Sequence, residues 1–175
     1  DITNYVIGEG NENAKIMIIG EAPGDKEDKS GRPFVGAAGS ILNKALTEAG
    51  IDRSDVYIAN ICNCRPPENR NPKKKEIKAC LPHLYKQIWQ IKPLYIITLG
   101  NVPTQALIPD CKKGIKALWG NRFNVPISDP DDYRRRLYVK IQPNYHPSFI
   151  LRGFGRPYFN DFKSIFKKVK KLTRS

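Results

Sequence analysis

The sequence lacks a long apolar run: no stretch reaches the roughly 18 consecutive apolar residues that a membrane-spanning helix needs. It also lacks a secretory signal pattern at its start. We therefore expect a cytoplasmic protein with no membrane partner. A chain of 175 residues can bury a sizeable core, and this length predicts a single domain over residues 1–175. We expect the protein to act as a monomer.

Acidic residues are scarce relative to basic ones. The chain has 17 Asp and Glu against 30 Lys and Arg, which gives a formal net charge of +13. This balance favours a polyanionic partner, and nucleic acid is the first candidate. A basic surface that serves only solubility is the alternative.

Cysteine is also scarce, and no secretory context accompanies it. Disulfides are therefore disfavoured, and reduced thiols or metal ligands are expected instead. The four cysteines are Cys62, Cys64, Cys80 and Cys111.

Short apolar runs rich in Ile, Val and Tyr predict buried strands, and each is closed by glycine, asparagine or proline. Apolar residues outside the strands recur with helical spacing, which predicts helices over 38–49, 77–91, 101–108 and 159–169. Pro82 is expected to bend or divide the second of these helices. The segment Cys111–Arg136 has no clean period and is expected to contain a long loop. The strands are expected at Ala14–Gly20, Asp55–Asn60, Leu94–Gly100 and Leu137–Pro143.

This alternation predicts an α/β fold, a three-layer α/β/α sandwich with a central four-stranded parallel sheet. Unusual residues follow each strand in turn: the loop Gly20–Gly36, then Asn60, Gly100 and the segment Pro143–Phe149. The carboxyl ends of parallel strands meet at one edge of the sheet, where ligands bind. We therefore expect a functional site at that edge.

The loop Gly20–Gly36 lacks the Lys-Ser/Thr ending of a Walker loop and the spacing of a dinucleotide fingerprint. It is also acidic, unlike a phosphate cradle. A plain strand-to-helix turn is one interpretation. However, Phe34 lies on this loop between proline and valine, where an aromatic ring can stack on a flat ligand.

Two further side chains, His146 and Asn60, each have a functional and a structural interpretation. His146 follows the last strand and precedes a proline, which fixes its position, although a lone histidine is often structural. His83 is expected to be structural or exposed. Asn60 could cap a turn, or present an amide donor and acceptor side by side to the edge of a pyrimidine.

Four segments carry a family pattern: GEAPGDKED, GRPFVGAAG, NICNCRPPENRNP and YHPSFILR. Together they resemble the family 4 uracil-DNA glycosylases of archaea and thermophilic bacteria, over nearly the whole chain. The resemblance implies base excision repair in association with the nucleoid: hydrolysis of the N-glycosidic bond of deoxyuridine in single- or double-stranded DNA, leaving an abasic site. A mismatch glycosylase for other bases and a non-catalytic DNA-binding module are the alternatives.

The resemblance also implies roles for residues. Phe34 would stack on uracil, Asn60 would bond its O4 and N3–H edge, and His146 would face O2. Better-known members of the superfamily have an aspartate where this chain has Ala22, so Glu21 or Glu27 would take over water activation, or little base would be needed. The implied substrate-binding set is Gly20, Glu21, Ala22, Phe34, Asn60 and His146.

Contacts to DNA are expected from two segments. Ile150 and Leu151 follow the histidine, where a wedge could fill the vacated base stack, and Arg152 could meet a phosphate. Arg65, Arg70 and 73–75 lie on a proline-rich, basic segment that could also meet phosphates.

The family carries a 4Fe-4S cluster on four cysteines, and Cys64 and Cys80 match two of them. The other pair would fall just before Asp1, and loss of the cluster is the alternative. Cys62 and Cys111 match no ligand, and buried free thiols are expected there.

Overall fold

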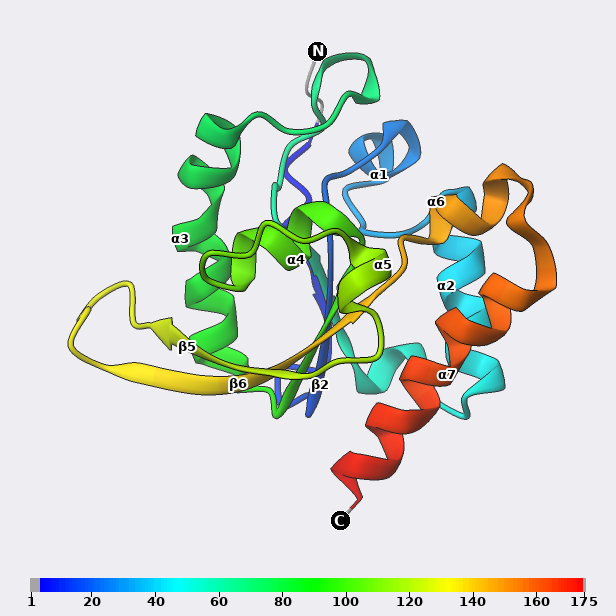
Figure 1. The fold of residues 1–175 in the computed structure, drawn as a ribbon. Coiled ribbons are helices and arrows are strands. Elements are labelled where there is room, and N and C mark those ends of the chain that lie inside the picture. Colours follow the sequence, from blue (N-terminus) through cyan, green and yellow to red (C-terminus); the bar gives the residue numbers. More distant parts are fainter. Residues whose placement is uncertain (1–3, 175) are drawn as a thin grey trace.

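The computed structural model describes residues 4–174 (Figure 1). Within them, one sheet has the spatial order β1-β3-β2-β4-β6-β5. The central strands β3, β2, β4 and β6 are parallel, and β1 and β5 pair antiparallel at the edges. The bounds are β1 (Glu9–Gly10), β2 (Ile16–Gly20), β3 (Tyr57–Asn60), β4 (Tyr95–Leu99), β5 (Phe123–Ser128) and β6 (Arg136–Asn144).

The strands β2 and β4 are almost entirely apolar because helices cover both of their faces. Every residue of β2 and of β4 is buried, as expected for a parallel strand inside a layered fold. In the register of the sheet, Ile18 lies opposite Ile58 on one side and Ile97 on the other.

The helices connect the strands across both faces of the sheet. Short turns η1 (Arg53–Asp55) and η2 (Pro67–Asn69) precede β3 and α3, and a π-type turn η3 (Ile150–Phe154) joins the last two helices. The helices are α1 (Asp25–Ser30), α2 (Ala37–Glu48), α3 (Lys74–Ile91), α4 (Asn101–Leu107), α5 (Ile115–Leu118), α6 (Pro147–Phe149) and α7 (Gly155–Thr173).

Two apolar clusters fill the space between the sheet and its helices. Leu42 of α2 and Phe162 of α7 pack on the face that carries Ile18. Leu84 of α3 and Leu107 of α4 pack on the opposite face. Figure 1 shows the same division, with α3 and α4 on one side of the sheet and α2 and α7 on the other. The α/β/α sandwich is therefore confirmed, and so is its four-stranded parallel centre.

The structure adds detail to two sequence-based expectations. Besides loops, the segment Cys111–Arg136 contains α5 and the edge strand β5. Pro126 hides β5 in the sequence, since proline is tolerated only where a strand needs no full ladder of hydrogen bonds. Pro82 does not divide its helix, because α3 continues through it from Lys74 to Ile91.

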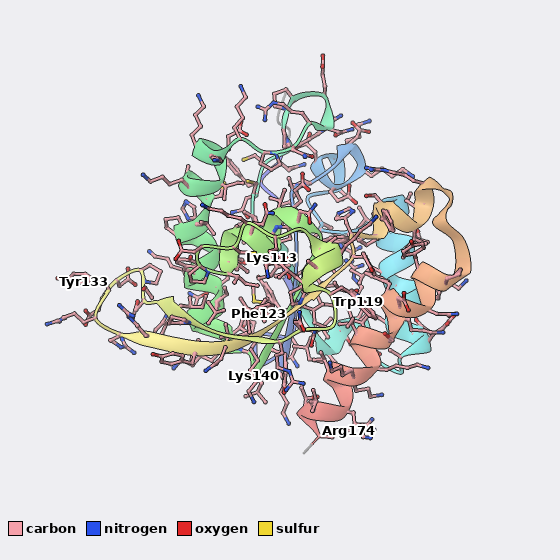
Figure 2. All side chains as sticks on the ribbon, viewed as in Figure 1. Lys113, Trp119, Phe123, Tyr133, Lys140 and Arg174 are labelled. Atoms are coloured by element: carbon pink, nitrogen blue, oxygen red, sulfur yellow. The ribbon has the colours of Figure 1, made fainter. Side chains whose placement is uncertain are left out.

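The β5–β6 hairpin extends away from the helical layers, and Tyr133 lies at its tip (Figure 2). Tyr133 is one of the most exposed large side chains, at 80%. Among the described residues, no helix combines the length and the apolar character that crossing a membrane requires.

Candidate active site

The ends of the parallel strands bring the expected residues together at the carboxyl edge of the sheet. Gly20, the last residue of β2, lies in register beside Asn60, the last residue of β3. On the other side of β2, Gly100 follows β4 and lies against His146, because a Cβ at Gly100 would be 3.0 Å from the His146 Cβ. The site therefore follows from the parallel topology.

Gly20 has no side chain, and the side chains of Phe34 and Asn60 lie where a Cβ at this position would be. A Cβ at this position would be 2.4 Å from Cζ of Phe34 and 2.5 Å from Oδ1 of Asn60. Both distances are far shorter than van der Waals contact. Position 20 therefore requires glycine so that the Phe34 ring and the Asn60 amide can occupy this space.

Asn60 is buried with one polar atom unsatisfied. Its side chain is 2% exposed, and Oδ1 has no hydrogen-bond partner among the described residues. Such a buried acceptor costs about 1–3 kcal/mol if it stays unpaired. The arrangement suits a ligand that brings an N–H donor to this oxygen.

Phe34 has an unusual backbone conformation. Its φ is 51°, in the left-handed region that non-glycine residues rarely adopt, and strain of this kind costs about 1–3 kcal/mol. The Phe34 and His146 rings have centroids 6.5 Å apart and are inclined at 40°. They do not stack on each other, so one face of Phe34 can serve a flat ligand.

His146 is held in one neutral form by its neighbours. It caps α6, and the Ser148 backbone N–H donates to its Nδ1 at 3.1 Å, with Ser148 Oγ 2.6 Å from the same nitrogen. Burial, followed by the charge of Arg152, lowers the pKa of His146 to about 4. Because Nδ1 accepts a hydrogen bond, the proton of the neutral ring lies on Nε2, which can donate to a ligand.

A cavity of about 390 Å³ opens beside these residues. Its described lining has one acidic side chain, Glu21, and three cationic ones, Arg70, Lys116 and Arg152. Burial raises the pKa of Glu21. Ala22 and His146 also line the cavity, whereas Phe34 and Asn60 do not, because both are buried against Gly20.

Glu27 has a different position from Glu21. Its Oε1 accepts hydrogen bonds from the backbone N–H groups of Val35, at 3.0 Å, and Gly36, at 2.8 Å. It is not among the residues that line the cavity. This geometry makes Glu27 a support for the Phe34 loop rather than a group facing a substrate.

The residues expected to contact DNA divide between the cavity and its surroundings. Arg152 and Arg70 line the cavity, but Arg70 is also paired with Glu76 at 2.8 Å. Arg65 does not line it and is paired with Asp25 at 2.9 Å.

The two apolar wedge candidates also differ. Leu151 is 48% exposed, whereas Ile150 is only partly buried and packs against the core cluster under α2 and α7. Lys116 was missed from the sequence because its segment has no regular pattern.

Three cysteines lie close together where β3 ends and α3 begins. Burial, then the neighbouring Cys80 thiol, raises the pKa of Cys62 to about 12, and burial followed by Cys80 also raises the pKa of Cys64. Cys62 is buried as expected, but Cys111 is only partly buried and lies elsewhere. Within residues 4–174, no group of three or more Cys, His, Asp or Glu side chains is arranged to hold a metal ion.

Comparisons with known proteins identify the family of this chain. The family model for the uracil DNA glycosylase superfamily matches residues 7–170. A type-4 uracil-DNA glycosylase from Pyrobaculum aerophilum is 44% identical over 154 residues, covering 85% of this chain and 74% of the relative. The type-4 enzymes of Thermotoga maritima and Archaeoglobus fulgidus are 43% and 37% identical, covering 86% and 97% of this chain and 73% and 82% of those relatives. The chain therefore belongs to the uracil-DNA glycosylase superfamily.

Proposed function

We propose that this protein excises uracil from DNA by hydrolysing the N-glycosidic bond of deoxyuridine, which leaves an abasic site. The observation that carries the assignment is the buried, unpartnered Oδ1 of Asn60 beside the ring of Phe34. The base must leave the stack to reach these groups, as enzymes that act on bases require. One copy of the chain supplies every residue of this proposal, which supports action as a monomer.

Base recognition is assigned to Asn60 and Phe34. Uracil presents an N3–H donor next to its O4 acceptor, and an asparagine amide complements both. Cytosine has no N3–H and carries an amino group at position 4, so in the same pose Oδ1 of Asn60 would face the N3 lone pair and Nδ2 would face the amino group. Sites built on such hydrogen bonds reject mismatched ligands strongly. The base passes between the Phe34 and His146 rings and stacks on Phe34.

Leaving-group stabilisation is assigned to His146. When the C1′–N1 bond breaks, the electron pair stays on uracil and negative charge develops on O2. The Nε2–H of the neutral imidazole donates to this oxygen, and its position is preset by the Ser148 contacts to Nδ1. A histidine with a pKa near 4 stays neutral at physiological pH, so it acts as a hydrogen-bond donor without a net charge.

We assign to Glu21 the activation of the attacking water and the stabilisation of the cationic sugar. Ala22 has no carboxylate and Glu27 is bonded to backbone N–H groups, which leaves Glu21 as the acid of the cavity lining. Its charge stabilises the oxocarbenium-like sugar, and it accepts a proton from the water that attacks C1′. The cations Arg70, Lys116 and Arg152 suit the phosphates of the flipped nucleotide. The exposed Leu151 suits the gap left in the stack.

The function is tested by measuring uracil release from labelled single- and double-stranded oligonucleotides in the presence of EDTA. We expect release of uracil and none of cytosine, which Asn60 rejects, or of thymine, whose 5-methyl group needs extra room. EDTA should have no effect, since the groups assigned here are protein side chains. Folded protein that creates no abasic sites would contradict the proposal.

The same assay tests Glu21. Because burial raises its pKa above the ordinary 4.5, the wild-type rate should fall on the acid side at a pH above 4.5. In Glu21→Gln we expect a loss of about tenfold, as for one partly solvated charge contact. The remaining acid limb should then move towards pH 4, where His146 takes up a proton. An unchanged pH profile would remove Glu21 from the mechanism.

A 4Fe-4S cluster is compatible with this chain only in part. Such a cluster is held by four thiolates, and we propose Cys64 and Cys80 as two of them. Their interaction supports this, and so does the N-terminal segment, where the Val6 N–H donates to the carbonyl of Asn63 at 2.8 Å. This bond places Val6 beside the loop that carries Cys64. The cluster would anchor the basic segment 65–79 at both ends and would take no part in the bond cleavage.

The cluster is tested with the full-length protein purified without oxygen. We expect brown protein that contains iron and sulfide, with visible absorption that Cys80→Ser abolishes. Cys111→Ser is the matched control, because Cys111 lies apart from the other thiols, with its Sγ near the Lys113 carbonyl. Colourless, iron-free wild-type protein would exclude the cluster.

A further inference from the structure

Two half-buried charged side chains form hydrogen bonds with the backbone of the loop that carries Phe34. Phe34 has a left-handed backbone conformation with a φ of 51°, so the loop needs outside contacts to keep it. These contacts come from Arg53, in the turn η1, and from Glu27, in α1. The side chains of both residues bind backbone groups of the loop.

Arg53 binds the carbonyl side of the loop. Its Nη2 donates to the carbonyl of Pro33 at 2.6 Å, and its Nη1 donates to the carbonyl of Phe34 at 2.9 Å. The same guanidinium reaches Asn43 Oδ1 on α2 at 2.7 Å and Glu9 Oε1 at 3.2 Å. Its planar fork of donors thus ties the loop to α2 and to the β1 edge of the sheet, a geometry that lysine cannot reproduce.

Glu27 binds the amide side of the same loop. Its Oε1 accepts the N–H groups of Val35 and Gly36, the two residues after Phe34. The helix α2 closes the loop from beneath, because a Cβ at Gly39 would be 1.9 Å from the Phe34 carbonyl oxygen. The peptide groups on both sides of Phe34 are therefore fixed, and with them the ring, which lies against Gly20 and Asn60.

We propose that Arg53 and Glu27 are positioning residues that fix the Phe34 ring and thereby limit the site to a flat pyrimidine. The proposal rests on the stacking of uracil on Phe34 proposed above. A ring held from both sides cannot retreat to admit a base such as 5-hydroxymethyluracil, whose hydroxyl group can stand out of the plane of the pyrimidine. A slot that differs by one methylene-sized group discriminates by about 10- to 200-fold, so even a small loosening has a measurable effect.

The test compares single-turnover release of uracil and of 5-hydroxymethyluracil from otherwise identical oligonucleotides. In Arg53→Lys we expect the rate on uracil to fall by about tenfold and the preference for uracil to shrink by about tenfold. Arg32→Lys is the matched control. Arg32 bonds the same Glu9, at 2.9 and 2.8 Å, without contacting the loop carbonyls, and this variant should keep both the rate and the preference.

Two variants of Glu27 distinguish a positioning role from a role in proton transfer. The amide oxygen of Glu27→Gln can still accept both N–H groups, so this variant should retain the uracil rate to within about fivefold, with the pH profile of the wild type. Glu27→Ala should behave like Arg53→Lys. Loss of activity in Glu27→Gln equal to that in Glu27→Ala would overturn the proposal in favour of a catalytic carboxylate.

Two further outcomes decide the remaining cases. If Arg53→Lys lowers the rates on both bases by the same factor, the residue serves stability alone and the proposal is wrong, even if the melting temperature falls. If the wild-type protein and Arg32→Lys both fail to release uracil, the proposed function is wrong and this inference falls with it. An active wild type with an unchanged preference in Arg53→Lys contradicts only the inference.

Discussion

His146→Ala is expected to lower the single-turnover rate of uracil release by on the order of 10²–10³, the usual effect of removing one preorganised donor to a developing oxyanion. Binding of uracil-DNA should change little, because the cations around the cavity remain. The physical reason is the fixed neutral tautomer: Ser148 holds Nδ1, so Nε2 carries the proton that is donated to O2 as charge develops there. The measurement is single-turnover kinetics together with a binding titration.

His83→Ala is the matched control for this variant. His83 is the other histidine of the chain, and it is exposed on α3, outside the cavity lining. Its removal should leave the rate unchanged. If His146→Ala turned over at near wild-type speed, the histidine would be a structural cap of α6 and the donor would have to be sought elsewhere.

The low pKa of His146 also has a consequence for stability. The folded-state pKa of about 4 lies below the ordinary 6.5, so the unfolded chain binds more protons between these values. This residue therefore destabilises the folded state as the pH falls from 6.5 to 4. In His146→Ala that contribution is absent, and the melting temperature should decline less steeply over this range than in the wild type.

The sequence was sufficient to predict the parallel centre of the sheet and the edge where the site lies. Strands such as β2 and β4 are buried on both faces, so they read as unbroken apolar runs. Once four such strands alternate with helices, their carboxyl ends converge. Asn60 and His146 could therefore be placed in one site without knowing any distance.

The supports of the site could not be predicted in the same way, because they depend on contacts between distant residues and the backbone. Arg53 bonds carbonyls 19 and 20 positions earlier, and such bonds leave no periodic pattern in the sequence. Glu27 looked like a catalytic carboxylate for the same reason, since the residue type alone does not reveal that its oxygen accepts two backbone N–H groups. Lys116 lies on the short helix α5, which is too brief to show a helical stripe.

Gly20→Ala is expected to abolish recognition of the base while the protein still folds. The added Cβ would be 2.4 Å from the Phe34 ring and 2.5 Å from Oδ1 of Asn60, so both groups must move by an ångström or more. A displacement of that size at reacting groups costs about 10²-fold in rate. The φ of Gly20 is not in the left-handed region, so the backbone itself tolerates alanine. The clash with two buried groups should also lower the melting temperature, so the rate is measured at a temperature where the variant is still folded.

Gly114→Ala is the matched control for Gly20→Ala. It also adds a methyl group near the cavity, but that group would not press on Phe34 or Asn60. A Cβ at Gly114 would have its nearest neighbour, Asn101 Oδ1, at 3.7 Å, an ordinary van der Waals contact, and this glycine precedes the cavity-lining residues of α5. We expect wild-type rates from this control. Because phosphate contacts lie outside the slot, Gly20→Ala should still bind abasic DNA as tightly as the wild type does, but it should lose the extra affinity for a flipped uracil. Uracil release by Gly20→Ala at the rate of Gly114→Ala would show that base recognition does not depend on the placement of the Phe34 ring and the Asn60 amide over Gly20.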